Sequence, residues 1–226
     1  MTDESINMRP IGHIESPLQD KFLIPRQPGL APAVHCRLRL LPEFAREEAW
    51  RGIGGFSHLW LLWNTHETTG WSPTVRPPRL GGNQRVGVFA SRSTHRPNPL
   101  ALSVVKLLAV EGDSLLLQGA DLLDGTPVFD VKPYLPYADA LVDAECGFAP
   151  DEPELLAVRF SAEADRWLAS EPAEKRQQVI ELLQQDPRPG YRRGEAQPDK
   201  VYGAQFSGVD LQWRVDEQGV EVLPPQ

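Results

Sequence analysis

The chain has 226 residues, 41% of them hydrophobic and 24% charged, and 31 acidic against 23 basic side chains give a formal net charge of -8. A soluble globular chain of this length buries roughly 70% of its unfolded surface, enough for one domain of about 150 residues and a small second one. The two cysteines are too far apart for a zinc knuckle or a secreted disulfide framework. Without a signal sequence or the ~20 apolar residues of a membrane span, we expect a cytoplasmic protein.

Short apolar runs separated by proline-containing pieces predict strands in the first two thirds of the chain. They cover residues 10–15, 34–41, 58–63, 85–90, 103–110, 114–119 and 128–132. Apolar and polar residues alternate from Val34 to Leu40, as in a half-buried strand, whereas the unbroken run Leu59–Trp63 predicts a strand buried on both faces. A single helix is expected at 43–50, after Pro42. We therefore predict a mainly β fold, a closed or nearly closed compact β-barrel.

The pattern changes after Gly147, where an acidic, proline-containing connector at 149–154 marks a boundary. We expect the barrel domain to cover residues 8–147 and a small α+β C-terminal domain to cover 148–226. In the second domain the pattern predicts a strand ending at 159–160, helices at 162–169 and 173–185, and a hairpin of strands 209–215 and 220–223.

The acidic average hides a basic stretch between Glu67 and Glu111. This stretch contains no acidic residue and carries Arg76, Arg79, Arg85, Arg92, Arg96 and Lys106. Arginines without acidic neighbours either form a solvated basic face or bind an anion such as phosphate. Common catalytic signatures are missing: no dinucleotide or phosphate-binding glycine motif, no hydrolase elbow and no zinc spacing of histidines occur. We expect no metal.

Four polar loops follow or precede the apolar strands, at 25–29, 64–68, 91–99 and 124–136, and their prolines make them rigid enough to hold polar groups around a ligand. Asp130 and Lys132 are two residues apart on one predicted strand, so both side chains point to the same face. The pair is either a surface salt bridge or part of a site.

The segments IGHIESP, KFLIPRQPGL, FSHLWLLW, WSPTVRPPRLGGN, VGVFASRSTHRPNPLALS and DLLDGTPVFDVKPYLPYAD resemble the TsaA-like family of tRNA methyltransferases. DPRPGYRRG and GVDLQWRV resemble its C-terminal domain, so the likeness extends from Ile11 to about Val215. The resemblance implies a barrel that binds S-adenosylmethionine without a Rossmann sheet, works as a homodimer, and N6-methylates N6-threonylcarbamoyladenosine at position 37 of the tRNA anticodon loop.

The same resemblance implies a set of cofactor-binding residues. They are Pro25, Arg26, Gln27, His66, Glu67, Arg92, Leu102, Asp124, Gly125, Thr126 and Pro127. Two departures from the family pattern stand out: Glu67 replaces Gln, and His95 with Leu100–Ala101 replaces Phe and Ile-Gly.

For catalysis, Asp130 is our candidate base or orienting carboxylate, because the carbamoylated N6 is a poor nucleophile until its proton is lost. Lys132 can stabilise charge on the ureido oxygen or hold the threonyl carboxylate, and Tyr134 can stack or hydrogen-bond beside it.

The basic stretch then acquires a role in RNA binding. We expect Arg76, Arg79, Arg85 and Arg96 to grip anticodon-loop phosphates, with a second grip from Arg188, Tyr191, Arg192 and Arg193. His95 either stacks on a base or is an exposed loop histidine.

Two other functions remain open. A non-catalytic barrel that binds RNA is disfavoured because the strands lack exposed aromatic pairs. A methyltransferase acting on a protein or small molecule would bind S-adenosylmethionine without affinity for tRNA.

Overall fold

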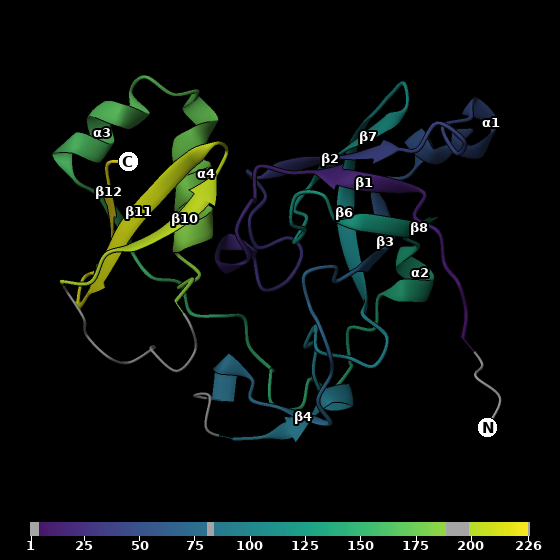
Figure 1. Ribbon diagram of the computed structural model, residues 1–226, viewed down its shortest axis with the longest axis horizontal. Coiled ribbons are helices and arrows are strands. Elements are labelled where there is room, and N and C mark those ends of the chain that lie inside the picture. Colours follow the sequence, from purple (N-terminus) through teal and green to yellow (C-terminus); the bar gives the residue numbers. More distant parts are fainter. Residues whose placement is uncertain (1–4, 81–83, 189–198, 226) are drawn as a thin grey trace.

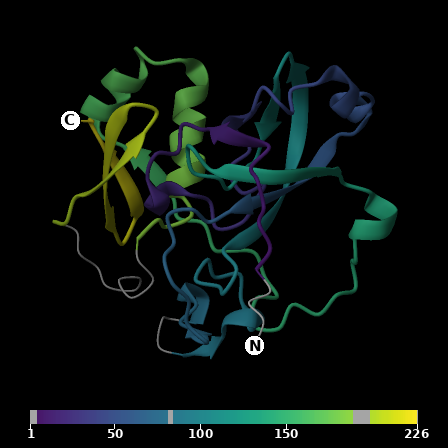
Figure 2. The same cartoon turned by 45° about the vertical axis from the view of Figure 1, so that its right-hand side comes forward.

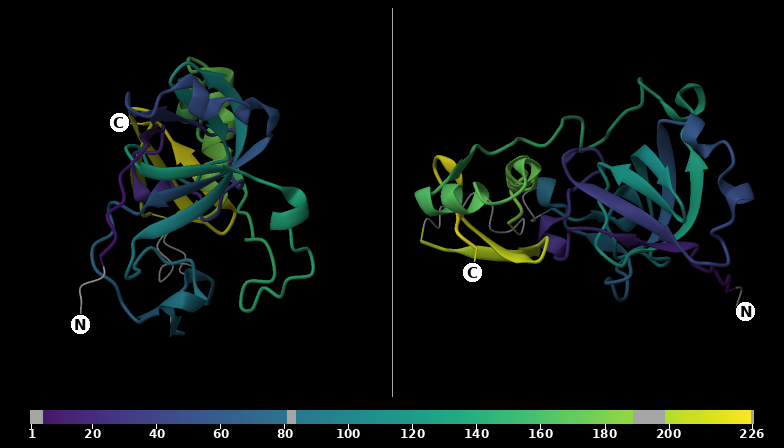
Figure 3. Two further views of the ribbon diagram at one scale, coloured as in Figure 1. Left: turned by 90° about the vertical axis from the view of Figure 1, so that its right-hand side faces the viewer. Right: turned by 90° about the horizontal axis from the view of Figure 1, so that it is seen from above.

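The computed structural model describes residues 5–80, 84–188 and 199–225. Two bodies lie side by side in it: a β-barrel on the right of Figure 1 and a small sheet with two helices on the left. The view from above in Figure 3 shows the same arrangement.

The barrel is closed by six strands. They are β1 (Gly12–Glu15), β2 (His35–Leu40), β3 (His58–Asn64), β6 (Leu100–Glu111), β7 (Ser114–Gln118) and β8 (Pro127–Pro133), in the order β1-β2-β7-β6-β3-β8. All neighbouring pairs are antiparallel. The predicted mainly β barrel is thereby confirmed.

Alternation along the strands fills the barrel interior. In β2, Cys36, Leu38 and Leu40 are buried, and they meet Leu59 and Leu61 of β3 in one apolar cluster. At roughly 1.5–3 kcal/mol for each large side chain removed from water, this cluster is the main force that closes the barrel.

The expectation that Leu59–Trp63 is buried on both faces is wrong. Leu59 and Leu61 have no exposed surface, but Trp60 and Leu62 on the outer face are only partly buried. A barrel needs an apolar inner face alone. The apolar outer face of β3 therefore needs another explanation, and the candidate site provides one.

Two further expectations change in the loops. The strand predicted at 85–90 is only the two-residue β5 (Val86–Gly87), paired with β4 (Thr74–Val75) and followed by a 3₁₀-helix at Val88–Ala90. These residues lie outside the barrel, so no barrel strand forms backbone hydrogen bonds with them that would extend the strand.

Helical structure also differs from the prediction. The helix expected at 43–50 is shortened to α1 (Glu47–Trp50), because Arg46 has an extended backbone. A second short helix, α2 (Pro136–Asp139), follows β8. Short 3₁₀ turns lie at Lys21–Leu23, Ile53–Gly55 and Pro78–Leu80.

The second body is the expected α+β unit. Its elements are β9 (Val158–Phe160), α3 (Ala162–Leu168), α4 (Ala173–Leu183), β10 (Tyr202–Phe206), β11 (Val209–Asp216) and β12 (Gly219–Leu223), with sheet order β10-β11-β12-β9. Ser161 caps α3, since its hydroxyl accepts from the Ala164 N–H at 3.1 Å. The hairpin β11–β12 is confirmed, whereas β10 was not predicted.

The core of this second body extends into the N-terminal third of the chain. Leu18, Leu23, Ala31 and Val34 belong to the same cluster as the buried residues of α4 and β11. Leu18 also forms a backbone bridge with Phe206 of β10. The segment between β1 and β2 therefore attaches the barrel to the second sheet.

Among the described residues, no helix is long and apolar enough to cross a membrane.

Candidate functional site

Three of the predicted loops, 25–29, 64–68 and 91–99, lie at one end of the barrel, which we call the loop end. The fourth, expected at 124–136, only begins there: residues 127–133 are strand β8, which runs to the opposite end. Asn64 at the end of β3 pairs with Leu100 at the start of β6, and Trp63 pairs with Val128 near the start of β8. His35, the first residue of β2, pairs with Gln118, the last of β7. The antiparallel register therefore brings together loops that are up to 100 residues apart in sequence.

Contacts between the loops hold this cluster together. The Thr65 N–H donates to the Pro99 carbonyl at 2.9 Å, and the Gly29 N–H donates to the Gly119 carbonyl at 2.7 Å. Arg92 donates to the side-chain oxygen of Gln27. Gln27 and Arg92, both assigned to the cofactor by resemblance, thus meet across two separate loops.

The turn at 124–127 is fixed by hydrogen bonds. Asp124 accepts from the Ser16 N–H at 2.8 Å, and the buried Thr126 hydroxyl donates to the Leu123 carbonyl at 2.7 Å. Gly125 has a φ of 75°, which favours glycine. Thr126 and Pro127 therefore shape the turn, while Asp124 and Gly125 are exposed at its tip.

The remaining cofactor candidates differ in their surroundings. Pro25 is buried, and the Arg26 guanidinium donates to the Asp186 carbonyl at 3.2 Å. Burial lowers the pKa of Arg26, and the Asp186 carboxylate opposes that shift. His66 and Glu67 are exposed beside the buried Thr65.

The outer faces of β6, β3 and β8 form a continuous surface next to the loop end, which we call the outer wall. Its first row is Leu102, Leu62 and Asp130, and its second row is Val104, Trp60 and Lys132. Directly opposed residues of antiparallel strands share a face. Leu102, a cofactor candidate, thus lies two strand spacings, about 10 Å, from Asp130.

Asp130 and Lys132 form an ion pair of 2.9 Å, with the lysine side chain 72% exposed. An exposed pair of this kind contributes about 0–1 kcal/mol to stability, so its charges are available to a ligand at little cost. Asp130 also accepts from the Val131 N–H at 2.9 Å.

Tyr134 lies further along the outer wall. Its ring is 5.8 Å from that of Trp60 and 6.3 Å from that of His58. Four residues of strand separate it from Asp130, or roughly 13 Å. The three proposed catalytic residues are therefore on one side of the barrel, but Tyr134 is not within contact distance of Asp130.

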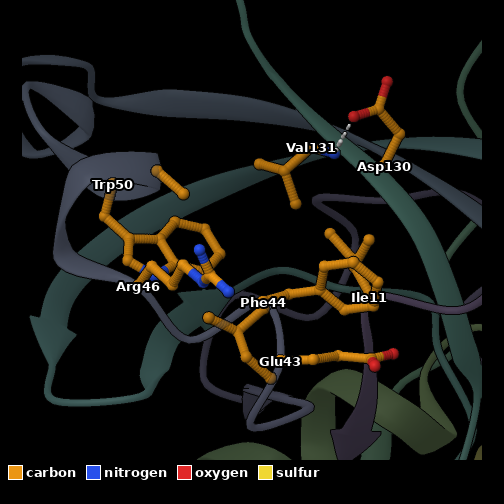
Figure 4. A pocket seen from close by; sticks show the side chains of 9 residues that line it. Ile11, Glu43, Phe44, Arg46, Trp50, Asp130 and Val131 are labelled. Carbon is orange, nitrogen blue, oxygen red and sulfur yellow. Dashed lines mark hydrogen bonds between the residues drawn. The ribbon is translucent and has the colours of Figure 1, made fainter.

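A cavity of about 430 Å³ opens beside Asp130, between β8 and the region of α1. Figure 4 shows Phe44, Trp50 and Ile11 around it, with Asp130 at its edge. It is lined by Ile11, Leu40, Glu43, Phe44, Arg46, Ala49, Trp50, Asp130 and Val131. None of its residues except Asp130 belongs to the sites predicted from the sequence.

The predicted phosphate-binding arginines have several different partners. Arg76 is exposed, Arg79 donates to the Asp151 carbonyl, and Arg85 donates to the Thr74 hydroxyl at 2.9 Å. Arg96 donates to the carbonyls of Val88 at 3.1 Å and Ser91 at 2.9 Å.

The second predicted grip is only partly described. Arg188 is 8% exposed and forms an ion pair with Asp186 at 2.7 Å. This pairing raises the pKa of Arg188 and holds its guanidinium within the fold. Tyr191, Arg192 and Arg193 lie outside the described residues. His95 is exposed, as a loop histidine would be.

A partly buried carboxylate at the loop end, that of Asp121, was not among the predicted site residues. The carboxylate of Asp121 accepts from the Ser103 hydroxyl at 2.6 Å, and Trp63 donates to the same hydroxyl at 2.9 Å. The available signal was an acidic residue between the apolar Ala120 and Leu122. In the parts of the chain that the structure describes, no group of three or more His, Cys, Asp or Glu side chains is arranged to hold a metal ion.

Comparison with known families matches both bodies. The tRNA-methyltransferase O N-terminal domain matches residues 13–140, and the TrmO C-terminal domain matches residues 153–224.

Individual relatives cover nearly the whole chain. The Escherichia coli protein named tRNA (adenine(37)-N6)-methyltransferase is 46% identical over 97% of both chains. A Pseudomonas aeruginosa protein named putative S-adenosylmethionine-dependent methyltransferase RcsF is 48% identical, covering 92% of this chain and 91% of its own.

The fold agrees with a solved relative. The crystal structure of TrmO from Pseudomonas aeruginosa superimposes with a TM-score of 0.82 at 39% identity, covering 98% of this chain and 97% of that one. With both family domains matched in order and the barrel shared, this chain belongs to the tRNA-methyltransferase O (TrmO) family.

Proposed function

We propose that this protein transfers a methyl group from S-adenosylmethionine to N6 of adenosine 37 in tRNA, and that the adenosine carries an N6-threonylcarbamoyl group. The E. coli relative, named for adenine-37 N6-methylation, supports the enzyme class and the tRNA substrate. The Asp130–Lys132 pair beside the loop end is the observation that carries the chemistry.

The cofactor is S-adenosylmethionine, as in the Pseudomonas relative's name, and the loop end suits it. Arg92, exposed and held by Gln27, can bind a carboxylate, and the rigid turn at Asp124–Pro127 offers backbone groups to an adenine edge. When bound, this group supplies a methyl on a positively charged sulfur.

The chain's own residues must position the acceptor nitrogen and manage its proton. Asp130 can accept the N6 proton, because its carboxylate is partly exposed and the Val131 N–H fixes its orientation. Lys132 can hold the threonyl carboxylate or the ureido oxygen, since only the exposed pair with Asp130 engages it among the described residues. Tyr134 acts further out, as a stacking or hydrogen-bonding group beside Trp60.

The experiment supplies purified protein with isotope-labelled S-adenosylmethionine and tRNA that carries or lacks the threonylcarbamoyl group, then identifies labelled nucleosides by mass spectrometry. We expect label only on the modified adenosine. Asp130→Asn and Lys132→Ala should each slow single-turnover methylation, Asp130→Asn by about 10²–10⁴-fold. Asp113→Asn, which changes an exposed carboxylate in the β6–β7 turn, is the matched control and should leave the single-turnover rate unchanged.

The outcome separates the alternatives left by the sequence. Cofactor binding without transfer to either tRNA would point to another acceptor. Unchanged single-turnover rates in both Asp130→Asn and Lys132→Ala would remove these residues from the reaction.

For tRNA binding, we propose that the exposed Arg76 and its neighbours Arg79 and Arg85 contact anticodon-loop phosphates. They lie on the segment that follows Glu67 and ends at Pro99, which extends below the barrel in Figure 1 and carries no acidic residue. We assign Arg96 chiefly to holding this segment, because two carbonyls engage its guanidinium.

We further propose a homodimer. Tyr137, Leu141 and Val142 are 88%, 77% and 91% exposed, on the arm after β8 that stands away from the barrel in Figure 2. An exposed apolar cluster of this kind is typical of an interaction surface, and a second copy is the occupant that the family resemblance implies. We also propose that the boundary between the two domains lies at 147/148. We place the protein in the cytoplasm, because the proposed tRNA substrate is found there.

A further inference from the structure

A chain of hydrogen bonds crosses the inside of the barrel at its loop end. Trp63, near the end of β3, donates to the Ser103 hydroxyl at 2.9 Å, and that hydroxyl donates to Asp121 at 2.6 Å. Ser103 has no exposed surface. Trp63 precedes the loop 64–68, Ser103 follows the loop 91–99, and Asp121 precedes the turn 124–127. The network therefore links a carboxylate to three parts of the loop end.

The surroundings leave the charge of this carboxylate only partly compensated. Among the described residues, Ser103 is the sole side chain that donates a hydrogen bond to Asp121. Burial raises the pKa of Asp121, while the Ser103 hydrogen bond and the charge of Arg92 oppose that shift. The other titratable group facing it is the Cys36 thiol of β2, whose pKa burial and the Asp121 charge raise to about 12.

Asp121 is partly buried. An incompletely compensated carboxylate in such a place is costly, and a cation bound beside it lowers that cost. Asp121 comes three residues before the turn proposed for the cofactor, and its charge neighbour Arg92 contacts Gln27 of another cofactor loop. The proposed methyl donor carries a permanent positive charge on sulfur, and the product left after transfer has a neutral sulfur.

We propose that Asp121, oriented by Ser103, is the specificity-determining counter-charge for the sulfonium, so that the protein binds the methyl donor more tightly than the demethylated product. This inference rests on the proposed function. It predicts selective release of product after each turnover, because the product lacks the positive charge that the Asp121 carboxylate attracts.

The test is calorimetric binding to the full chain without tRNA. The ligands are S-adenosylmethionine, S-adenosylhomocysteine, and sinefungin, which has an amine in place of the sulfonium. Asp121→Asn should weaken the two cationic ligands about 10-fold or more and the neutral one about 3-fold or less.

A purely structural role would weaken all three ligands equally, and that result would overturn the inference. Asp113→Asn also replaces a carboxylate by an amide, so it is the matched control and should leave the ratios between the three ligand affinities unchanged. Should Asp121→Asn fail to fold, Ser103→Ala decides. Loss of the orienting hydrogen bond should lower the affinity for S-adenosylmethionine relative to S-adenosylhomocysteine, and an unchanged ratio would contradict the proposal.

The two proposals fail in different ways. Binding of neither S-adenosylmethionine nor its product by the wild type would remove the proposed cofactor and this inference together. If the wild type binds both ligands and Asp121→Asn leaves the ratio of their affinities unchanged, only the inference is removed.

Discussion

Gly12 shows how a single residue sets the barrel geometry. It pairs with Leu40 on one side and Val128 on the other, and a Cβ added there would lie 2.3 Å from the Arg39 carbonyl oxygen. Because that oxygen is backbone, the strand itself must shift. We expect Gly12→Ala to lower the free energy of unfolding by about 1–3 kcal/mol, measured as a lower urea midpoint.

Gly54 provides the control for this prediction. It has an ordinary φ, and a Cβ there would meet nothing within 4 Å. Gly54→Ala should therefore leave the midpoint within about 0.5 kcal/mol of the wild type. Equal effects of the two substitutions would mean that the close approach at Gly12 is not what limits this position.

At the scale of elements, Arg96 organises the segment that follows β5. Its guanidinium donates to the carbonyls of Val88 and Ser91, and it lies 5.6 Å from the Phe89 ring. Both hydrogen bonds start from one nitrogen, Nη1. A lysine keeps the charge, but it is shorter and lacks the planar guanidinium that lies over the Phe89 ring. We expect Arg96→Lys to reduce turnover about 10-fold or more, nearly as much as Arg96→Ala, because the loop shifts the cofactor groups beside it.

Arg76→Ala is the comparison for this element. Arg76 is exposed, so its loss should weaken tRNA binding, reduce the salt dependence of that binding by about one unit of log–log slope, and leave turnover at saturating tRNA unchanged. Full turnover in Arg96→Lys would show that Arg96 acts only through its charge.

The elements also show how far sequence reasoning reaches. The alternation in β2 and the hairpin β11–β12 are local patterns, and both were predicted. The five-residue β10 pairs with β11 across the turn Ser207–Gly208, so this hairpin is local too. Its signal, the buried Ala204 and Phe206 alternating with exposed residues, is too short to have been recognised as a strand. The segment 85–90 has a strand-like composition but no barrel neighbour to complete a ladder.

The site divides in the same way. Polar, proline-rich loops can be recognised from sequence, and register then brings them to one end. Asp121 could not be recognised, because its hydrogen-bond partner Ser103 is 18 residues away and Trp63 is 40 residues from Ser103. The apolar outer face of β3 was read as doubly buried because the sequence does not distinguish a core from a surface that a ligand or a partner covers.

At the scale of the whole molecule, the segment between β1 and β2 links two cores. Leu18 and Leu23 pack with Val179 and Trp213 of the second body, so the core of that body includes residues that the family's N-terminal domain matches. A chain so tied keeps the loop end in a fixed relation to the second sheet. The arm at 134–147 is held at its start, where Trp60 donates to Asp139 at 3.0 Å, while Tyr137, Leu141 and Val142 remain exposed.

The arm therefore carries the last prediction, which concerns the assembly. We expect the protein to have twice the 25.2 kDa mass of one chain in light scattering, and the double substitution Leu141→Asp, Val142→Asp to give the single mass. Each apolar side chain buried in a dimer contributes roughly 1.5–3 kcal/mol, and each of the two copies loses two such side chains. The dissociation constant of the dimer should therefore rise at least ~100-fold. Leu155→Asp, at a side chain 56% exposed on the connector, is the control and should remain dimeric. A single mass for the wild type at micromolar concentration would refute the homodimer, and a dimer that survives the double substitution would move its interface away from the arm.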